Sequence, residues 1–313
     1  MTLVGMVTRQ IHRKAYNPIG LFKTKCRPKT AKVTTKLVWL MLEFYESIAK
    51  GDILSLPINS HVQIPKSIMK NFSHLQIEKN EKNQPVKMEY VYFLDLSDQT
   101  IKKESIKKLD TVFGYYSQDT EEFLRDYVEG PVGDLMKNAR LFHQGKTSPL
   151  TFDVNAMKNY ICYALLRSQL VLNEVNRPSA TKELLEALGH NSTITHEKIL
   201  MHPEALAGAF DNFSANTFEN NTDVEFVVPR NCTYYTHYRD GNLMWVAPFS
   251  PKGAFVLVEN GKSLVEKGVF HTDDSKLIEQ MNVHALQCEL TVNRRFIVAS
   301  RERELEMLTH FAS

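Results

Sequence analysis

Four side chains in the sequence are of the types that carry hydrolytic chemistry: His61, Arg167, Asn231 and Ser250. A histidine can act as a general base, and an arginine can stabilise an oxyanion as it develops. The carboxylate cluster that a metal-dependent nuclease needs is not evident from the spacing of the acidic residues. A hydrolase, in its most specific form a nuclease-like toxin, is therefore one hypothesis, and the sequence leaves open whether the chain is an enzyme.

The motifs of familiar cofactor and metal sites are missing from the sequence. There is no phosphate loop, dinucleotide fingerprint, HExxH sequence or nucleophile elbow. The four cysteines form no CxxC pair, which argues against a zinc ribbon or a redox dithiol and favours reduced thiols. We therefore expect no metal and no cofactor.

The hydropathy of the chain predicts no membrane partner. No signal-peptide pattern is visible, and the longest strongly apolar run, at residues 37–45, is far shorter than the roughly 20 residues that span a bilayer. Hydrophobic residues make up 43% of the chain and charged residues 24%, as in ordinary globular proteins. These features predict a cytoplasmic protein.

Charge is placed unevenly along the chain. The net charge is only +2, but residues 1–36 hold nine basic residues and no acidic one, which leaves 29 basic and 36 acidic residues in the remainder. Such a basic arm is typical of a polyanion partner. It can equally dock on the acidic body of its own chain, and both interpretations stay open. The predicted nucleic-acid contacts are Arg9, Arg13, Lys14, Lys23, Lys25, Arg27 and Lys29 in the arm, and Arg230; Arg239, Arg294 and Arg295 add positive charge among the C-terminal strands.

The order of elements predicts an α+β fold, mostly antiparallel sheet with a central helical region. Residues 37–49 read as an apolar helix after the arm, residues 88–106 as a strand, a turn and a return strand, and residues 120–213 as helices. Short strands follow in 224–258 and 295–299, and we expect both strand-rich regions to join in one sheet. The predicted division is a basic arm with its helix at 1–57 and a single domain at 58–313.

Several segments resemble, in order, the bacterial family known as domain of unknown function 4238. "PKSIMKNF" is similar to the end of its N-terminal signature, with Pro65, Asn71 and Phe72 matching. "VYFLDLSDQTIKKESIKKL" resembles its strand–turn–strand, and "VFGYYSQDTEEFLRDYVEGPV" its tyrosine-rich loop and Glu-Gly helix. Arg167 falls where the family has an arginine at the end of a core helix, "VAPFSPKGAFVLV" resembles its Pro-Leu-Ser-Pro strand, and Asn282 its late helix asparagine.

Two positions depart from the family pattern. The histidine of the family aligns with Val62, so that His61 is displaced by one position. The Ser-Asp-Asn-Pro segment of the family aligns with residues 229–232, where only Asn231 is kept and Arg230 replaces the acid. The retained positions are mostly of a structural kind, and the opening stretch around Pro65 reads as the entry to the domain.

Three classes of function remain open at this stage. The first hypothesis is a nucleic-acid-binding protein, and the gene neighbourhoods typical of the family imply a phage-defence or mobile-element system. The second is the hydrolase introduced above, and the third is an interaction subunit of a larger complex, with a protein partner or a second copy of the chain. Arg167, on an apolar helix, is expected to be at least half buried and paired with a carboxylate or backbone carbonyls.

Overall fold

The computed structural model describes most of the chain after residue 56. The described residues are 57–61, 64–79, 81–143, 146, 153–167, 200, 210–237, 243–259, 269–292 and 295–312. The basic arm at 1–36, the helix predicted over 37–49 and most of the region between 168 and 209 lie outside this part.

The described strands form three sheets. A two-stranded sheet pairs β1 (Pro57–His61) with β5 (Thr111–Ser117). The second, here called the hairpin sheet, runs in the order β2 (His74–Lys79), β3 (Pro85–Asp95), β12 (Phe296–Ala299) and β7 (Val228–Pro229), and β4 (Thr100–Ser105) pairs with the other edge of β3. The third, the central sheet, runs in the order β11 (Val269–Thr272), β6 (Phe213–Asn220), β10 (Gly253–Glu259), β9 (Leu243–Ser250) and β8 (Tyr234–His237).

Strand pairing confirms the predicted α+β class with mostly antiparallel sheets. All described pairs are antiparallel except β11 with β6. The expectation of one sheet is wrong: β3 and β4 join only β7 and β12 of the later strands, and β6 and β8–β11 form the central sheet. Each hydrophobic cluster nevertheless draws residues from both sheets: one includes Val91 and Phe255, and the other includes Leu94 and Val256.

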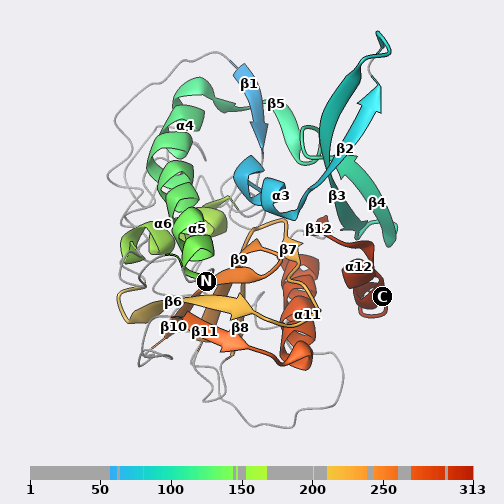
Figure 1. Cartoon of the computed structure of the whole chain (residues 1–313). Helices are drawn as coiled ribbons and strands as arrows, with labels where there is room; N and C mark the ends of the chain where they lie inside the picture. The colour runs from blue at the N-terminus through green and yellow to red at the C-terminus, as the bar shows by residue number, and fades with distance from the viewer. Residues whose placement is uncertain are drawn as a thin grey trace, which may run out of the picture.

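Helices cover both faces of the central sheet (Figure 1). On one face, α6 (Val154–Leu166) packs against β6, and the Tyr160 ring meets the Phe255 ring edge-on. On the other, α11 (Ser275–Val292) adds Ile278 and Leu286 to the cluster that contains Val246. β10 is buried on both sides for this reason. α12 (Glu302–Thr309) packs on β3 and β4, and α3 (Lys66–Phe72) packs on β9.

A continuous helical run holds a wide turn where the sequence has a glycine and a proline. α4 (Gln118–Phe123) passes into the π-helix η1 (Leu124–Glu129) and then into α5 (Gly130–His143). The Gly130 N–H donates to the Arg125 carbonyl, five residues earlier. Pro131 has no N–H, and its ring is incompatible with an undisturbed α-helix, so the helical run accommodates it with this wide turn.

Two asparagines, Asn71 and Asn282, hold the fold together. Asn71 donates from Nδ2 to the Phe249 carbonyl at 2.7 Å, which ties α3 to β9. Asn282, fully buried on α11, donates to the Glu225 carbonyl at 2.7 Å and accepts from the Val227 N–H at 3.1 Å. Both residues satisfy backbone groups that burial would otherwise leave without partners.

Replacing Asn282 with alanine is expected to lower the free energy of unfolding by about 2–4 kcal/mol, because two buried backbone groups lose their partner. Denaturant titration followed by circular dichroism measures the loss. Gln280→Ala changes an exposed position of the same helix and is the matched control, with an expected change below about 0.5 kcal/mol. Equal losses in the two variants would contradict this role for the amide.

Candidate functional site

Arg167 lies at the centre of a buried polar cluster between the helices and the sheets. It ends α6, and its side chain is 2% exposed. Its Nη1 atom lies 3.5 Å from Oε1 of Glu129, the last residue of η1, and its Nε donates to the Tyr116 hydroxyl at 3.4 Å. Its guanidinium carbon lies 4.7 Å from the ring centroid of Tyr163 and 5.3 Å from that of Tyr116. The prediction of a buried, carboxylate-paired arginine is confirmed.

The ionisation of this cluster follows from its burial. Burial raises the pKa of Glu129, although the positive charge of Arg167 works in the opposite direction. Burial alone would lower the pKa of Arg167, but Tyr163, Tyr116 and Glu129 hold it well above its ordinary value. The guanidinium therefore stays charged, and both aromatic rings and a carboxylate surround it. This is the environment of an arginine that stabilises the fold.

Cys232 lies in the same region, on the turn after β7. Its backbone has φ 60°, a left-handed conformation uncommon for a residue with a side chain, and its side chain is fully buried. Burial raises the pKa of its thiol, with a smaller opposing effect of Arg167. The thiol therefore stays protonated at neutral pH and is a poor nucleophile.

A second buried ion pair involves the turn at residues 229–232. Arg230 is 9% exposed, and its Nη2 lies 2.8 Å from Oδ1 of Asp110. The Arg230 N–H donates to Glu289 Oε2 at 3.0 Å, and the other oxygen of Asp110 accepts from the Ile64 N–H at 3.0 Å. Arg230, predicted to contact phosphates, thus lies in the interior with its guanidinium engaged by Asp110.

The structure describes two of the remaining sequence candidates, Asn231 and Ser250. Asn231 is buried and lies between Arg230 and Cys232 in the turn after β7. Ser250 ends β9, where its hydroxyl faces Gly253 across the turn to β10. The side chain of His61 and all seven candidate residues of the arm lie outside the described part of the chain.

An open depression lies beside η1 and the start of α5. It has a volume of about 730 Å³ and is lined on one side by Arg125, Asp126 and Asp134, and on the other by Asp153. Asp126 is paired with Arg125 at 2.7 Å, which lowers its pKa, and Asp153 caps α6 by accepting from two backbone N–H groups. Within the described residues, no cluster of histidine, cysteine and acidic side chains could hold a metal ion.

The hairpin sheet carries a different arrangement, which we call the aromatic–basic face: the exposed His74 and Lys103 and the half-buried Tyr90 and Tyr92. Register places all four on one side of the sheet, since Tyr90 is opposite His74 and Tyr92 is opposite Lys103. Lys103 Nζ lies 5.1 Å from the Tyr90 ring centroid and 5.8 Å from that of Tyr92. The ring of His74 meets Tyr92 edge-on, with centroids 5.9 Å apart.

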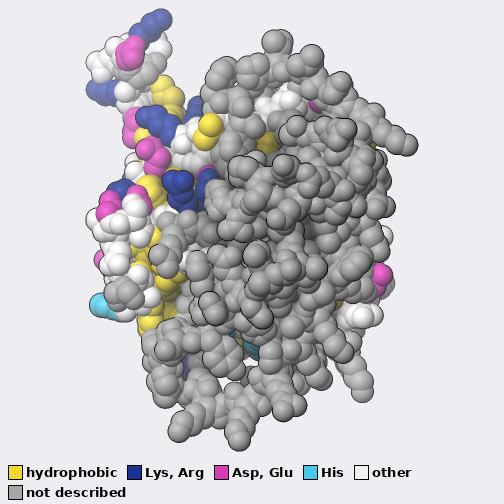
Figure 2. Space-filling view, turned by 180° about the vertical axis from the view of Figure 1, so that it is seen from behind, with side chains coloured by type: hydrophobic (Ala, Val, Ile, Leu, Met, Phe, Trp, Pro, Cys, Tyr) yellow, Lys and Arg dark blue, Asp and Glu magenta, His cyan; other side chains and the backbone are white. Residues whose placement is uncertain are grey.

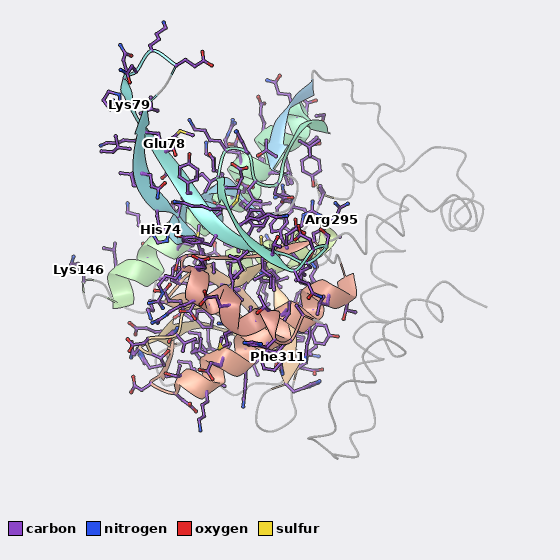
Figure 3. The ribbon with its side chains drawn as sticks, turned by 90° about the vertical axis from the view of Figure 1, so that its right-hand side faces the viewer. His74, Glu78, Lys79, Lys146, Arg295 and Phe311 are labelled. Carbon is purple, nitrogen blue, oxygen red and sulfur yellow. The ribbon has the colours of Figure 1, made fainter. Side chains whose placement is uncertain are left out.

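Neighbouring groups fix the position of this face. The Tyr90 hydroxyl donates to Glu78 Oε1 at 2.6 Å, and this bond raises the Tyr90 pKa, so that the phenol stays neutral. The His74 ring is hydrogen-bonded to the Ser300 carbonyl, just before α12 begins. In Figure 3, His74 lies near the base of the projecting hairpin, and Glu78 lies closer to its tip. Sequence reasoning missed this face, although Tyr90 and Tyr92 alternate with buried Val91 as strand residues do.

Comparisons with known families, proteins and structures found no match for this chain: it matches no protein-family model, no curated protein and no solved structure. No helix within the described residues is long and apolar enough to cross a membrane.

Replacing Arg167 with methionine should lower the free energy of unfolding by about 3–5 kcal/mol, because the substitution leaves the carboxyl of Glu129 enclosed without its cation. Denaturant titration measures the loss, and Arg125→Met, at a side chain 67% exposed, is the matched control. The double variant Arg167→Met/Glu129→Gln should recover part of the loss, since it removes the uncompensated charge.

The same loss should be smaller near pH 4 than at pH 7. Burial raises the folded-state pKa of Glu129 above its value in the unfolded chain, and losing Arg167 raises it further. A carboxyl with a raised folded-state pKa favours the fold at low pH, and this contribution disappears as the pH rises. A loss independent of pH would contradict the pairing with Glu129.

Proposed function

We propose that this protein binds single-stranded nucleic acid across the aromatic–basic face. The observation that carries the proposal is the position of the exposed Lys103, whose ammonium lies over the half-buried rings of both Tyr90 and Tyr92. Sheet surfaces that present aromatic rings beside positive charge bind unpaired bases by stacking and phosphates by electrostatic attraction.

The spacing of the two tyrosines suits this function. Residues two apart on a strand point to the same side and lie roughly 7 Å apart along it. Each ring can therefore take a separate base, and Lys103 can turn to a phosphate between them. Duplex DNA presents its bases as paired edges inside grooves, which flat stacking surfaces do not read, so the proposal favours single strands.

The basic arm supports the same conclusion from another part of the chain. Its nine positive charges with no acidic residue would gain free energy by releasing counterions from a polyanion. We propose that the arm adds affinity that is independent of sequence, while the aromatic–basic face holds the bases. The resemblance to a family found in defence-associated and mobile gene neighbourhoods fits a role in phage defence.

The hydrolase hypothesis has less support. Its oxyanion-stabilising group, Arg167, is enclosed by Tyr116, Tyr163 and Glu129, where a substrate would have to displace them. The interaction-subunit hypothesis concerns a different surface and is compatible with nucleic-acid binding.

Replacing Tyr90 and Tyr92 together with alanine should weaken binding of a fluorescent single-stranded 20-mer by at least tenfold at fixed salt, because each stacked base contributes about 1–3 kcal/mol. Lys103→Gln should weaken binding and make the slope of log K against log salt less steep by about 0.7. Fluorescence anisotropy in a salt series, with RNA and DNA in parallel, measures both effects.

Lys137→Gln, at an exposed position of α5, removes one positive charge that lies away from the aromatic–basic face. It should leave both the affinity for the 20-mer and the slope of log K against log salt almost unchanged. Deleting residues 1–36 should weaken binding to every sequence alike and leave the effect of the tyrosine variant intact. Unchanged binding by the double tyrosine variant, or a Lys137→Gln variant as weak as Lys103→Gln, would overturn the proposal.

A further inference from the structure

The hairpin formed by β2 and the first half of β3 projects from the molecule (Figure 1), and in the space-filling view it stands clear of the other described atoms, with hydrophobic and charged side chains intermixed (Figure 2). All six residues of β2 are exposed, and Leu75 and Ile77 are 60% and 71% exposed. Among the described strands, β2 pairs only with β3. Its outer edge is therefore a row of backbone donors and acceptors beside two bare aliphatic side chains, a template for another strand.

We propose that β2 pairs with β2 of a second copy of this chain, antiparallel and about a two-fold axis, to form a dimer with one sheet continuous across both copies. The axis passes between Gln76 and its symmetry mate. Leu75 of each copy then lies opposite Ile77 of the other, and His74 opposite Glu78. An interface of this isologous kind needs a surface that is complementary to itself.

The sequence of β2 is self-complementary in this register. Both aliphatic side chains of one copy meet both of the other on the same face, and on the opposite face the acidic Glu78 meets a histidine. Shifting the register by one residue would place Leu75 opposite Glu78 and mix the two faces. Shifting it by two would place Leu75 opposite Lys79 in one direction and Ile77 opposite Ser73 in the other, so only the proposed register pairs both aliphatic residues with aliphatic residues.

The neighbouring strand extends this match. Glu89 lies opposite Leu75 in β3, and Lys87 lies opposite Ile77. Across the four strands of the dimer, one row would run from Glu89 through Leu75 to Ile77 and Lys87 of the second copy. The aliphatic cluster at the centre is thus flanked by opposite charges, and no like charges face one another.

The edge of a strand this short gives a small interface, below the roughly 1,200 Å² that stable complexes bury, so we expect a weak dimer that dissociates on dilution. A two-stranded ribbon is only marginally stable in water, and pairing would order it.

Because the two-fold axis is perpendicular to the sheet, the aromatic–basic faces of both copies would lie on the same side. The dimer itself does not rest on nucleic-acid binding.

Sedimentation velocity of the full chain over a range of concentrations tests the dimer. The natural protein should shift from monomer to dimer as concentration rises. Ile77→Lys should raise the dissociation constant of the dimer at least tenfold, because it places a charge in the aliphatic cluster. Val112→Lys makes the same change at a 46% exposed valine of β5 and should leave dimerisation unaltered. A monomer at every concentration, or equal effects of the two variants, would overturn the proposal.

Cross-linking tests the register and does not depend on how Ile77→Lys folds. Gln76→Cys places two thiols opposite each other at the axis, within the Cα separation of about 4.4–6.8 Å that a disulfide requires. Mild oxidation should give a covalent dimer much faster than in the natural chain, whose own thiols set the background. Lys87→Cys lies on the same hairpin but three strand spacings from its mate, more than about 14 Å, and should not exceed that background. If Gln76→Cys cross-links no faster than Lys87→Cys, the proposed register is wrong. If, in addition, the natural chain sediments as a monomer at every concentration, the proposed dimer is wrong.

Discussion

Two buried guanidinium–carboxylate pairs join segments that are far apart in the chain. Arg167 at the end of α6 meets Glu129 at the end of η1, and Arg230 after β7 meets Asp110, 120 residues earlier. Removing a charge from water costs several kcal/mol, so each arginine must keep its partner in place for the interior to remain stable. The first pair thereby links η1 to the end of α6, and the second links the 229–232 turn to the start of β5, because a shift of either partner would leave a buried charge unmatched.

The second pair also extends into backbone. Asp110 accepts from the N–H of Ile64 as well as from Arg230, and Glu289 accepts from the N–H of Arg230. These contacts bring the entry to α3, the end of β7 and the last turns of α11 to one place. Arg230 therefore has one acidic partner for its guanidinium and another for its N–H, and a basic side chain is accommodated in the interior at this position.

Local patterns predicted the elements better than their assembly. The apolar spacing of α6 and α11 and the alternation of β3 were readable, and Arg167 could be expected to be buried because its helix is apolar. The division of the strands between two sheets depends on contacts such as Val298 with Phe93, which join distant segments and leave no local signal. The same limit applies to Arg230: its positive charge was visible, but Asp110, its partner, was not. β2 was missed because its apolar alternation extends over only Leu75 and Ile77, in a strand that is polar otherwise.

The alkylation rates of two buried cysteines would report how often the interior opens. Cys162 on α6 and Cys232 beside Arg167 are 1% and 0% exposed, and burial raises the pKa of both thiols. A thiol reagent can reach such groups only when the surrounding structure opens. Because Cys162 sits within a helix and Cys232 on a turn with left-handed backbone, their alkylation rates would report two different opening events: the detachment of α6 from the central sheet and the loosening of the turn that holds Arg230.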